Sequence, residues 1–274
     1  MIVVTLTTIP TRLVNTYHGD LGMISSIKSL INQTHNDYKI YLNIPKVFKA
    51  TGEEYVIPEW LLTLADKEDK LEIYSGLEDL GPSTKLIPTV RRLKDPEDLI
   101  IVVDDDVVYH PDMIKEHIKN QSNFPEAVVG YDGMRSKDNL FGDVRDYYHS
   151  GTRRTSRVDV IQHYKSVSYK RRYFEEDFEQ FVNENFTWED DLLLSAYFAY
   201  KKRDRIVTYH ESDPELTFEE WQSRGGVWTF PFEKHTNHDT QEGCNIYRGD
   251  NDKANLFITN ENLNLWQFID NGYK

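Results

Sequence analysis

The stretch Leu99–Asp106, LIIVVDDD, places five consecutive aliphatic residues directly before three aspartates. Such an aliphatic run is typical of a buried strand in a parallel sheet. Parallel sheets bind their ligands at the carboxyl ends of the strands, and Asp104, Asp105 and Asp106 stand at such an end. Three ionised carboxylates at a half-buried strand end repel one another, and a divalent cation removes that cost. The stretch therefore predicts an α/β sheet with a cation site at its edge.

The geometry of a strand divides the three aspartates between two faces. Because alternate residues of an extended chain point the same way, we expect Asp104 and Asp106 on one face and Asp105 on the other. Oxygen-only ligands of this kind suit Mg²⁺ or Mn²⁺ that bridges to substrate phosphates. The simplest alternative is a solvated acidic turn that caps the helix predicted from Pro111. The position at the edge of a parallel sheet favours the cation site.

Strand and helix patterns alternate along the first 130 residues, which predicts βαβ units and a mostly parallel sheet. Strands are predicted at residues 2–6, 38–44, 71–74, 99–103 and 127–129. Helices are predicted at residues 20–33 and 57–64, at 84–93 with Pro88 near the start or at a kink, and from Pro111 as first helical residue. The second half is less regular, with one clear helix over residues 189–201. We expect one domain over residues 1–274, with residues 1–130 and 131–274 as its two halves.

Composition narrows the function classes. The 274 residues include 32 Lys and Arg and 46 Asp and Glu, and the net charge of −14 argues against a nucleic-acid surface. The single cysteine, Cys244, excludes an internal disulfide and a multi-cysteine zinc site. The sequence predicts neither a transmembrane segment nor a signal peptide, so we expect a cytoplasmic protein. Its partner is expected to be neutral or to arrive with a cation.

The segment Asp104–Asp106 resembles the metal-binding Asp-x-Asp motif of GT-A-fold glycosyltransferases, which use nucleotide-sugar donors. Three further segments resemble that family in the same order along the chain. Thr5–Arg12 (TLTTIPTR) looks like the first-strand segment around the base and ribose, and Gly81–Lys85 (GPSTK) looks like the loop between base and phosphates. Trp188–Asp191 (WEDD) is similar to the acidic motif at a helix start. The resemblance implies a GT-A, Rossmann-like α/β fold, with a donor-binding half over residues 1–130 and an acceptor half after it.

The same resemblance implies roles for the metal ligands. Asp106 is expected as the principal ligand of Mn²⁺ or Mg²⁺, with Asp104 on the metal or on the ribose. Asp105 is an alternative for either role. A C-terminal histidine is expected as a further ligand, with His238 preferred over His235.

The donor and the catalytic base are assigned in the same way. Donor contacts are expected from Thr5, Thr7, Thr8, Arg12 and Lys85, and the two cations are expected near the base or the diphosphate. The base that takes the proton of the acceptor hydroxyl is expected to be Asp190, with Asp191 next and Glu189 beside them. These acids stand at a helix N-terminus, where the helix dipole stabilises carboxylates. Simple helix capping is the alternative interpretation.

The sequence therefore predicts a metal-dependent, inverting glycosyltransferase. The expected donor is a UDP-sugar, with a GDP-sugar second, and the expected acceptor is a glycan or a glycosylated carrier. Trp188, Trp221 and Trp228 offer faces on which sugars stack, or they belong to the core. A metal-dependent nucleotidyltransferase, a catalytically inactive glycan-binding module and retaining transfer stay open as alternatives. One departure from the family concerns His163–Tyr169, where a glycine pair is expected and this chain has Lys165 and Ser166.

Overall fold

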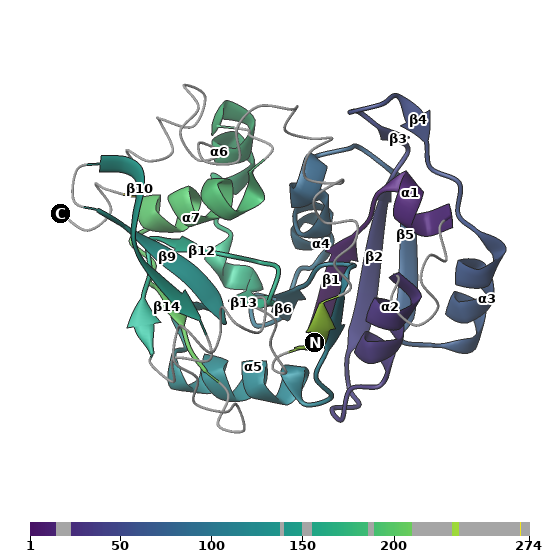
Figure 1. The fold of residues 1–274 in the computed structure, drawn as a ribbon, viewed down its shortest axis with the longest axis horizontal. Helices are drawn as coiled ribbons and strands as arrows, with labels where there is room; N and C mark the ends of the chain where they lie inside the picture. Colours follow the sequence, from purple (N-terminus) through teal and green to yellow (C-terminus); the bar gives the residue numbers. More distant parts are fainter. Residues whose placement is uncertain are drawn as a thin grey trace.

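A computed structural model describes residues 1–14, 23–137, 140–149, 155–185, 189–209, 232–235 and 269. Within these residues a central sheet of eight strands lies between helices (Figure 1). The strand order is β11-β14-β8-β13-β6-β1-β2-β5. No helix in this part of the chain is long and apolar enough to cross a membrane.

The half of the sheet built from the N-terminal residues is parallel. Its strands are β5 (Leu71–Leu77), β2 (Lys39–Pro45), β1 (Ile2–Thr7) and β6 (Leu99–Val102). Val4 of β1 lies opposite Ile40 of β2 on one side and opposite Ile101 of β6 on the other. Because all four strands run the same way, the carboxyl ends of β1 and β6 lie side by side.

The other half of the sheet mixes both directions. Its strands are β13 (Val167–Lys170), β8 (Val128–Gly130), β14 (Arg205–Val207) and β11 (Ser156–Arg157). β13 is antiparallel to both β6 and β8, whereas β14 is parallel to β8. A strand from the second half of the chain therefore separates two strands of the first half.

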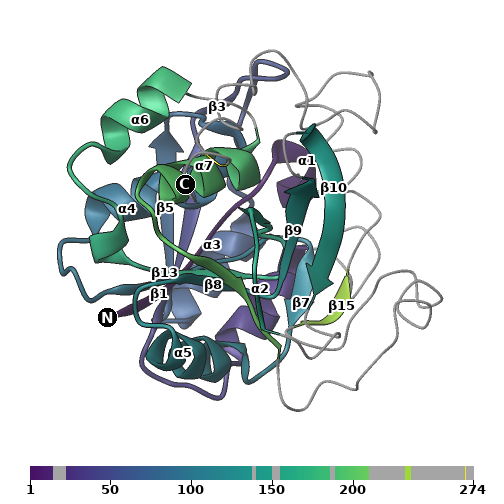
Figure 2. The same cartoon turned by 90° about the vertical axis from the view of Figure 1, so that its left-hand side faces the viewer.

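Three smaller sheets surround this core. They consist of β9 (Asp132–Lys137) with β10 (Leu140–His149) and β12 (Val160–Ile161), of β7 (Val107–Tyr109) with β15 (Phe232–His235), and of β3 (Val47–Phe48) with β4 (Glu53–Glu54). Figure 2 shows β15 lying beside β7. This pairing brings a C-terminal segment next to the residues that follow Asp106.

Short helices connect the strands. They are α1 (Pro10–Val14), α2 (Met23–Ile31), α3 (Glu59–Lys67), the 3₁₀ helix η2 (Gly81–Lys85), α4 (Ile87–Arg92), α5 (Met113–Asn123), the 3₁₀ helix η4 (Arg171–Tyr173), α6 (Phe178–Asn185) and α7 (Asp190–Tyr200). Alternation along the strands sends neighbouring side chains to opposite faces. Val102 therefore packs in a core shared with α4, α6 and α7, and Val103 packs in a core shared with α2, α3 and α5.

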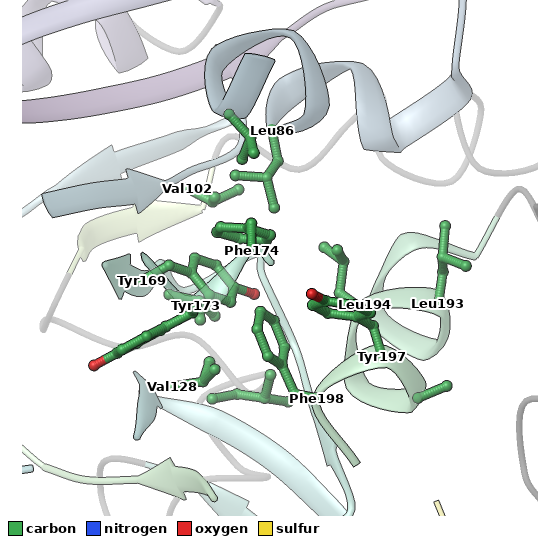
Figure 3. Close-up of a cluster of buried hydrophobic side chains, with 14 of the residues drawn as sticks. Leu86, Val102, Val128, Tyr169, Tyr173, Phe174, Leu193, Leu194, Tyr197 and Phe198 are labelled. Carbon is green, nitrogen blue, oxygen red and sulfur yellow. The ribbon is translucent and has the colours of Figure 1, made fainter. Parts of the chain in front are cut away.

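The core beneath α7 is rich in aromatic rings. Tyr169, Phe174, Tyr197 and Phe198 are buried together between the sheet and the helix (Figure 3). Their ring centroids lie 5.2 to 6.4 Å apart where they pair, which is the range in which aromatic contacts are favourable. This packing fixes α7 and with it the acidic residues at its first turn.

The predicted α/β class with a mostly parallel sheet is confirmed. Each predicted strand and helix of the first 130 residues has its counterpart, and the helix predicted at 189–201 is α7. The helix predicted at 84–93 is divided into η2 and α4, with Pro88 in the first turn of α4. Pro111 as the first helical residue is wrong, because α5 begins at Met113 after Asp112 as N-cap. The two-half, single-domain organisation over residues 1–274 stays a prediction.

Candidate active site

Three segments meet at the carboxyl ends of β1 and β6. The chain leaves β1 into α1, which carries Arg12, and it leaves β6 into Asp104–Asp106. The helix η2 brings Lys85 to the same edge, because the buried hydroxyl of Thr5 in β1 donates to the backbone oxygen of Lys85 at 2.5 Å. Both predicted cations therefore lie beside the aspartates.

Arg12 binds two of the three carboxylates. Its guanidinium donates to Asp105, and its Nη2 lies 3.4 Å from Oδ2 of Asp106. The second oxygen of Asp105 accepts from the hydroxyl of Thr8 at 2.5 Å. We expected Asp105 on the opposite face from Asp106, but Arg12 contacts both. The expectation is wrong because residues 105 and 106 form a turn and not an extended segment. The turn lets a single guanidinium reach both side chains.

Asp105 and Asp106 are almost completely buried, with 3% and 4% of their surface exposed. Burial raises the pKa of both carboxyls above the ordinary aspartate value, and the charge of Arg12 opposes that rise. Arg12 faces both carboxylates and the charge of Lys85 also lowers the pKa of Asp106, but the three carboxylates of Asp104, Asp105 and Asp106 outnumber these two cations when all are ionised. A further cation at this place would stabilise their charged forms.

Asp104 and Asp190 are joined through Lys85. The ammonium of Lys85 lies 2.8 Å from Oδ1 of Asp104 and 2.9 Å from Oδ2 of Asp190. Burial lowers the pKa of Lys85, but Asp104, Asp190 and Asp191 more than compensate, so the pKa is raised and the ammonium stays charged. Asp104 is also held by its backbone, whose N–H donates to the hydroxyl of Tyr109 at 2.8 Å. The predicted metal motif and the predicted catalytic motif are therefore adjacent.

The acids at the start of α7 are not simple caps. Glu189 is the N-cap residue, but its side chain makes no capping hydrogen bond. Asp190 faces Lys85, and Asp191 accepts a hydrogen bond at 3.0 Å from the backbone N–H of His163. Both carboxylates thus bind groups outside their own helix, which disfavours capping as their whole purpose.

His163 is a site residue that the sequence analysis did not identify. Its ring is completely buried, and Nδ1 lies 2.5 Å from Oδ1 of Asp191 and 3.4 Å from Oδ2 of Asp190. One ligand atom from each of His163, Asp190 and Asp191 lies within 4.8 Å of the others. A lone histidine carries no periodic pattern, so only its place at the head of the unusual stretch His163–Tyr169 could have drawn attention to it.

The three predicted threonines all have internal partners. Besides Lys85, the hydroxyl of Thr5 lies 2.7 Å from that of Thr89, and Thr5 has no exposed surface. The hydroxyl of Thr7 donates to the backbone oxygen of Asn43 at 2.8 Å, and that of Thr8 faces Asp105. The hydroxyl of Thr5 therefore joins β1 to η2 and α4 and does not face open space.

Several predicted residues lie outside the described part of the chain. They are His238, Trp188, Trp221 and Trp228. For His235 the backbone is described, and it lies opposite Val107, the residue after Asp106. The described strand β15, which ends at His235, therefore passes close to the residue that follows Asp106.

No protein-family model matches the sequence, and no curated protein matches it. Among solved structures, that of S. aureus TarS is similar, with a TM-score of 0.51 and 14% identity over 97% of this chain and 47% of that one. A crystal structure of residues 1–349 of TarS with UDP-GlcNAc has a TM-score of 0.47 and 12% identity over 81% of this chain and 60% of that one. The structure of the same fragment with UDP has a TM-score of 0.49 and 11% identity over 78% of this chain and 58% of that one.

The fold is GT-A-like. At 14% identity, the likeness to TarS shows the arrangement of strands and helices and nothing of the chemistry. It agrees with the mostly parallel central sheet of this chain. This chain spans about half the length of the TarS chain in the first of these structures and about three fifths of the fragment of residues 1–349.

Proposed function

We propose that this chain is a glycosyltransferase that moves a sugar from a nucleotide diphosphate sugar to the hydroxyl of a glycan or glycosylated carrier. The observation that carries the proposal is the ammonium of Lys85 between Asp104 and Asp190. The positive charge of Lys85 suits a diphosphate. It lies between Asp104, which belongs to a motif of the metal-binding type, and Asp190, whose carboxylate can act as a base. The GT-A-like fold supports the same activity.

The donor is a UDP-sugar in this proposal, with a GDP-sugar as second choice. S. aureus TarS, which has a similar fold, has been crystallised with UDP and with UDP-GlcNAc. Arg12 and Lys85 are both cations at the carboxyl edge of the sheet, so both are placed to meet the negative charge of such a donor.

The residues at the strand end fit Mn²⁺ or Mg²⁺. All their ligand atoms are carboxylate oxygens, which both ions accept. Asp105 has its two oxygens on Arg12 and Thr8, so Asp106 and the more exposed Asp104 are the ligands in this proposal. His238 is a further ligand, consistent with β15 passing beside Val107. A bound divalent ion would supply Lewis-acid stabilisation of the diphosphate leaving group.

The chain's own residues then have separate tasks. The acceptor oxygen forms a bond to the anomeric carbon while the bond from that carbon to the diphosphate oxygen breaks, which inverts the configuration. Asp190 takes the hydroxyl proton, and Lys85 offers its positive charge to the leaving diphosphate. Asp190 is favoured over Asp191 as the base because it lies beside Lys85, whereas Asp191 is bonded to His163. Glu189 is the N-cap residue before both.

Calorimetric titration with UDP and with GDP, each with and without Mn²⁺, tests the proposal. The wild type is expected to bind one of the two nucleotides more tightly with Mn²⁺. Asp106→Asn keeps the shape of the side chain and removes its charge, so it is expected to weaken Mn²⁺-dependent binding at least about tenfold, or about 1.4 kcal/mol. Asp112→Asn, at the N-terminus of α5, is the matched control and should bind like the wild type.

Turnover is measured as release of UDP from UDP-GlcNAc. Asp190→Asn is expected to lower kcat roughly 100- to 10,000-fold while the affinity for UDP changes little, because a positioned base contributes about that much to rate. Wild-type protein that binds glycans but neither nucleotide would contradict the proposal and indicate a glycan-binding module. Release of diphosphate from a nucleoside triphosphate would instead indicate a nucleotidyltransferase.

A further inference from the structure

The imidazole of His163 lies in a buried chain of hydrogen bonds behind Asp190 and Asp191. Its Nε2 lies 2.5 Å from the hydroxyl of Tyr169, and its Nδ1 lies 2.5 Å from Oδ1 of Asp191. The ring also stacks on that of Tyr169, with 6.0 Å between centroids. Both ring nitrogens are therefore used, and the orientation of the ring is fixed from two sides.

The direction of these hydrogen bonds follows from both neighbours of the ring, because the carboxylate of Asp191 accepts and the hydroxyl of Tyr169 can donate. Burial raises the pKa of its hydroxyl well above the ordinary value, and the charges of Asp191 and Asp190 raise it further. Tyr169 therefore keeps its proton and can donate it to Nε2. We assign the imidazole proton to Nδ1, where it is donated to Asp191.

The loop that carries His163 is fastened along one side of α7. The backbone N–H of Ile161 donates to the hydroxyl of Ser195 at 3.1 Å, and that of His163 donates to Asp191 at 3.0 Å. Residues 191 and 195 lie one helical turn apart on the same face. The position of His163 relative to the start of α7 is therefore set by two backbone contacts besides its ring.

Asp190 lies between the side chains of Lys85 and His163, and its Oδ2 makes a charge contact but no hydrogen bond with either. Its Oδ2 is 2.9 Å from the ammonium of Lys85 and 3.4 Å from Nδ1 of His163. Lys85 approaches from the sheet edge, and His163 approaches from the interior, where it holds the neighbouring Asp191. The carboxylates of Asp190 and Asp191 therefore lie between the ammonium of Lys85 and the imidazole of His163.

A metal ion on His163, Asp190 and Asp191 is the competing interpretation of the same cluster. Two contacts disfavour it. Nδ1 of His163 is already within hydrogen-bond distance of Asp191, and the ammonium of Lys85 places a positive charge next to the oxygen of Asp190 that such an ion would need. The arrangement fits a hydrogen-bonded network better than a metal site.

We propose that His163 is a positioning residue, which holds Asp191 and thereby sets Asp190 in the orientation that takes the proton of the acceptor. This inference rests on the proposed function, in which Asp190 is the base. Tyr169 supports the same arrangement, because its hydroxyl holds the imidazole at Nε2. Neither residue is expected to touch the nucleotide.

The test compares His163→Leu, which removes both ring nitrogens, with His163→Asn, whose amide can still donate to Asp191. Tyr169→Phe removes only the partner of Nε2. The control is His35→Leu, the same change from histidine to leucine in the loop between α2 and β2. Release of UDP from UDP-GlcNAc with Mn²⁺ gives kcat and KM across pH, and calorimetry gives the affinity for UDP.

For His163→Leu, kcat is expected to fall roughly 100-fold, the loss that a misplaced catalytic group causes, with KM and UDP affinity within about twofold. His163→Asn and Tyr169→Phe should lose less. The acidic limb of the kcat profile should shift in His163→Leu, because Asp191 loses the ring N–H donor and the resulting rise in its pKa changes the charge next to Asp190. A residue with a merely structural role would not move that limb.

The outcomes separate the two proposals. Wild-type protein that binds neither UDP nor GDP overturns the proposed function. Wild-type activity together with unchanged kcat in folded His163→Leu overturns only the role of His163. Loss of Mn²⁺ binding in His163→Leu, measured without nucleotide and retained in Asp106→Asn, also overturns it, in favour of a metal site on α7.

Discussion

Lys85 and Asp190 form a buried ion pair, with 2.9 Å between Nζ and Oδ2, that joins η2 to the first residue of α7. The same ammonium lies 2.8 Å from Asp104 at the end of β6. Three segments that are distant in sequence thus share one charge. Because carboxylates raise the pKa of Lys85, that charge persists at neutral pH. The ion pair therefore belongs to the stability of the fold as well as to the proposed chemistry.

Replacing Lys85 with methionine is expected to lower the free energy of unfolding at pH 7 by about 3–5 kcal/mol, because it leaves buried carboxylates without their cation. Loss of the cation also raises the pKa of those carboxyls in the folded state. The deficit should therefore be largest at neutral pH and shrink as the pH falls and they become protonated. Urea denaturation of both proteins at pH 7 and pH 5 measures this.

Lys85→Arg is the matched control, since it keeps the positive charge, and it should lose less stability than Lys85→Met at pH 7. Equal losses in the two variants would show that side-chain shape, and not charge, is what this position requires. A deficit for Lys85→Met that stays constant between the two pH values would contradict the assignment of uncompensated carboxylates.

The sequence reveals the parallel half of the fold because its strands carry a local signal. The aliphatic run of β6 and the aspartates after it predict both a strand and a ligand edge. β13 carries no such signal: its residues VSYK are mixed in character, and its place between β6 and β8 depends on pairings across distant parts of the chain. Local periodicity cannot express a contact of that kind.

The site divides in the same way. Lys85, Asp104 and Asp190 are found from their chemistry and from the order of motifs, and the structure brings them together. The orientation of Asp105 is mispredicted because the strand ends before it and the chain turns. His163 is missed because its importance comes from three contacts, and none of them leaves a pattern in the sequence.

A second buried ion pair lies in the stretch that departs from the expected glycine pair. The ammonium of Lys165 is 2.6 Å from Oδ2 of Asp132, both side chains are buried, and the hydroxyl of Tyr164 donates to the same oxygen at 2.8 Å. Lys165→Met is expected to cost about 3–5 kcal/mol in unfolding free energy. The double variant Lys165→Met with Asp132→Asn should recover part of that loss, because no buried charge is left unpaired.

The control for this cycle is an exposed pair. Lys49 lies 3.4 Å from Glu78, and both side chains are largely exposed, so Lys49→Met should change stability by less than about 1 kcal/mol. Thermal or urea unfolding of the four proteins in the cycle gives the coupling. A double variant that is no more stable than Lys165→Met alone would contradict the ion-pair explanation.

The buried His117 is expected to make the folded state less stable in acid. Burial lowers its pKa to about 3, and its Nε2 lies 2.8 Å from the hydroxyl of Ser166. Below pH of about 6.5 the unfolded chain binds a proton on this ring and the folded chain does not. Stability should therefore fall as the pH drops, by up to about 1.4 kcal/mol per pH unit for this residue.

Urea denaturation between pH 7 and pH 4.5 checks this slope. His117→Phe keeps a ring next to Tyr131 and removes the titration, so its stability should depend less steeply on pH than that of the wild type. His35→Gln, in the loop between α2 and β2, should leave the slope nearly unchanged. Parallel curves for the wild type and His117→Phe would show that another group causes the acid sensitivity.

Ser166 occupies a backbone conformation that favours glycine, with φ of 78°. It ends the turn in which its N–H donates to the backbone oxygen of His163 at 2.8 Å, so the conformation is imposed by the loop that carries the site. Ser166→Gly and Ser166→Ala both lose the hydroxyl bond to His117, and only glycine relieves the strain. The difference in unfolding free energy between the two variants therefore measures the cost of the left-handed backbone conformation at residue 166.

Ser166→Gly is expected to be about 0.5–1 kcal/mol more stable than Ser166→Ala, because the left-handed conformation costs a residue with a Cβ about 1–2 kcal/mol and glycine loses more entropy on folding. Thermal unfolding of both variants measures the difference. An alanine variant as stable as the glycine variant would show that residue 166 can leave this conformation without cost. In that case, the backbone angle φ would not explain why a glycine is expected at residue 166. The loop would then accept Ser166 in place of glycine for reasons unrelated to φ.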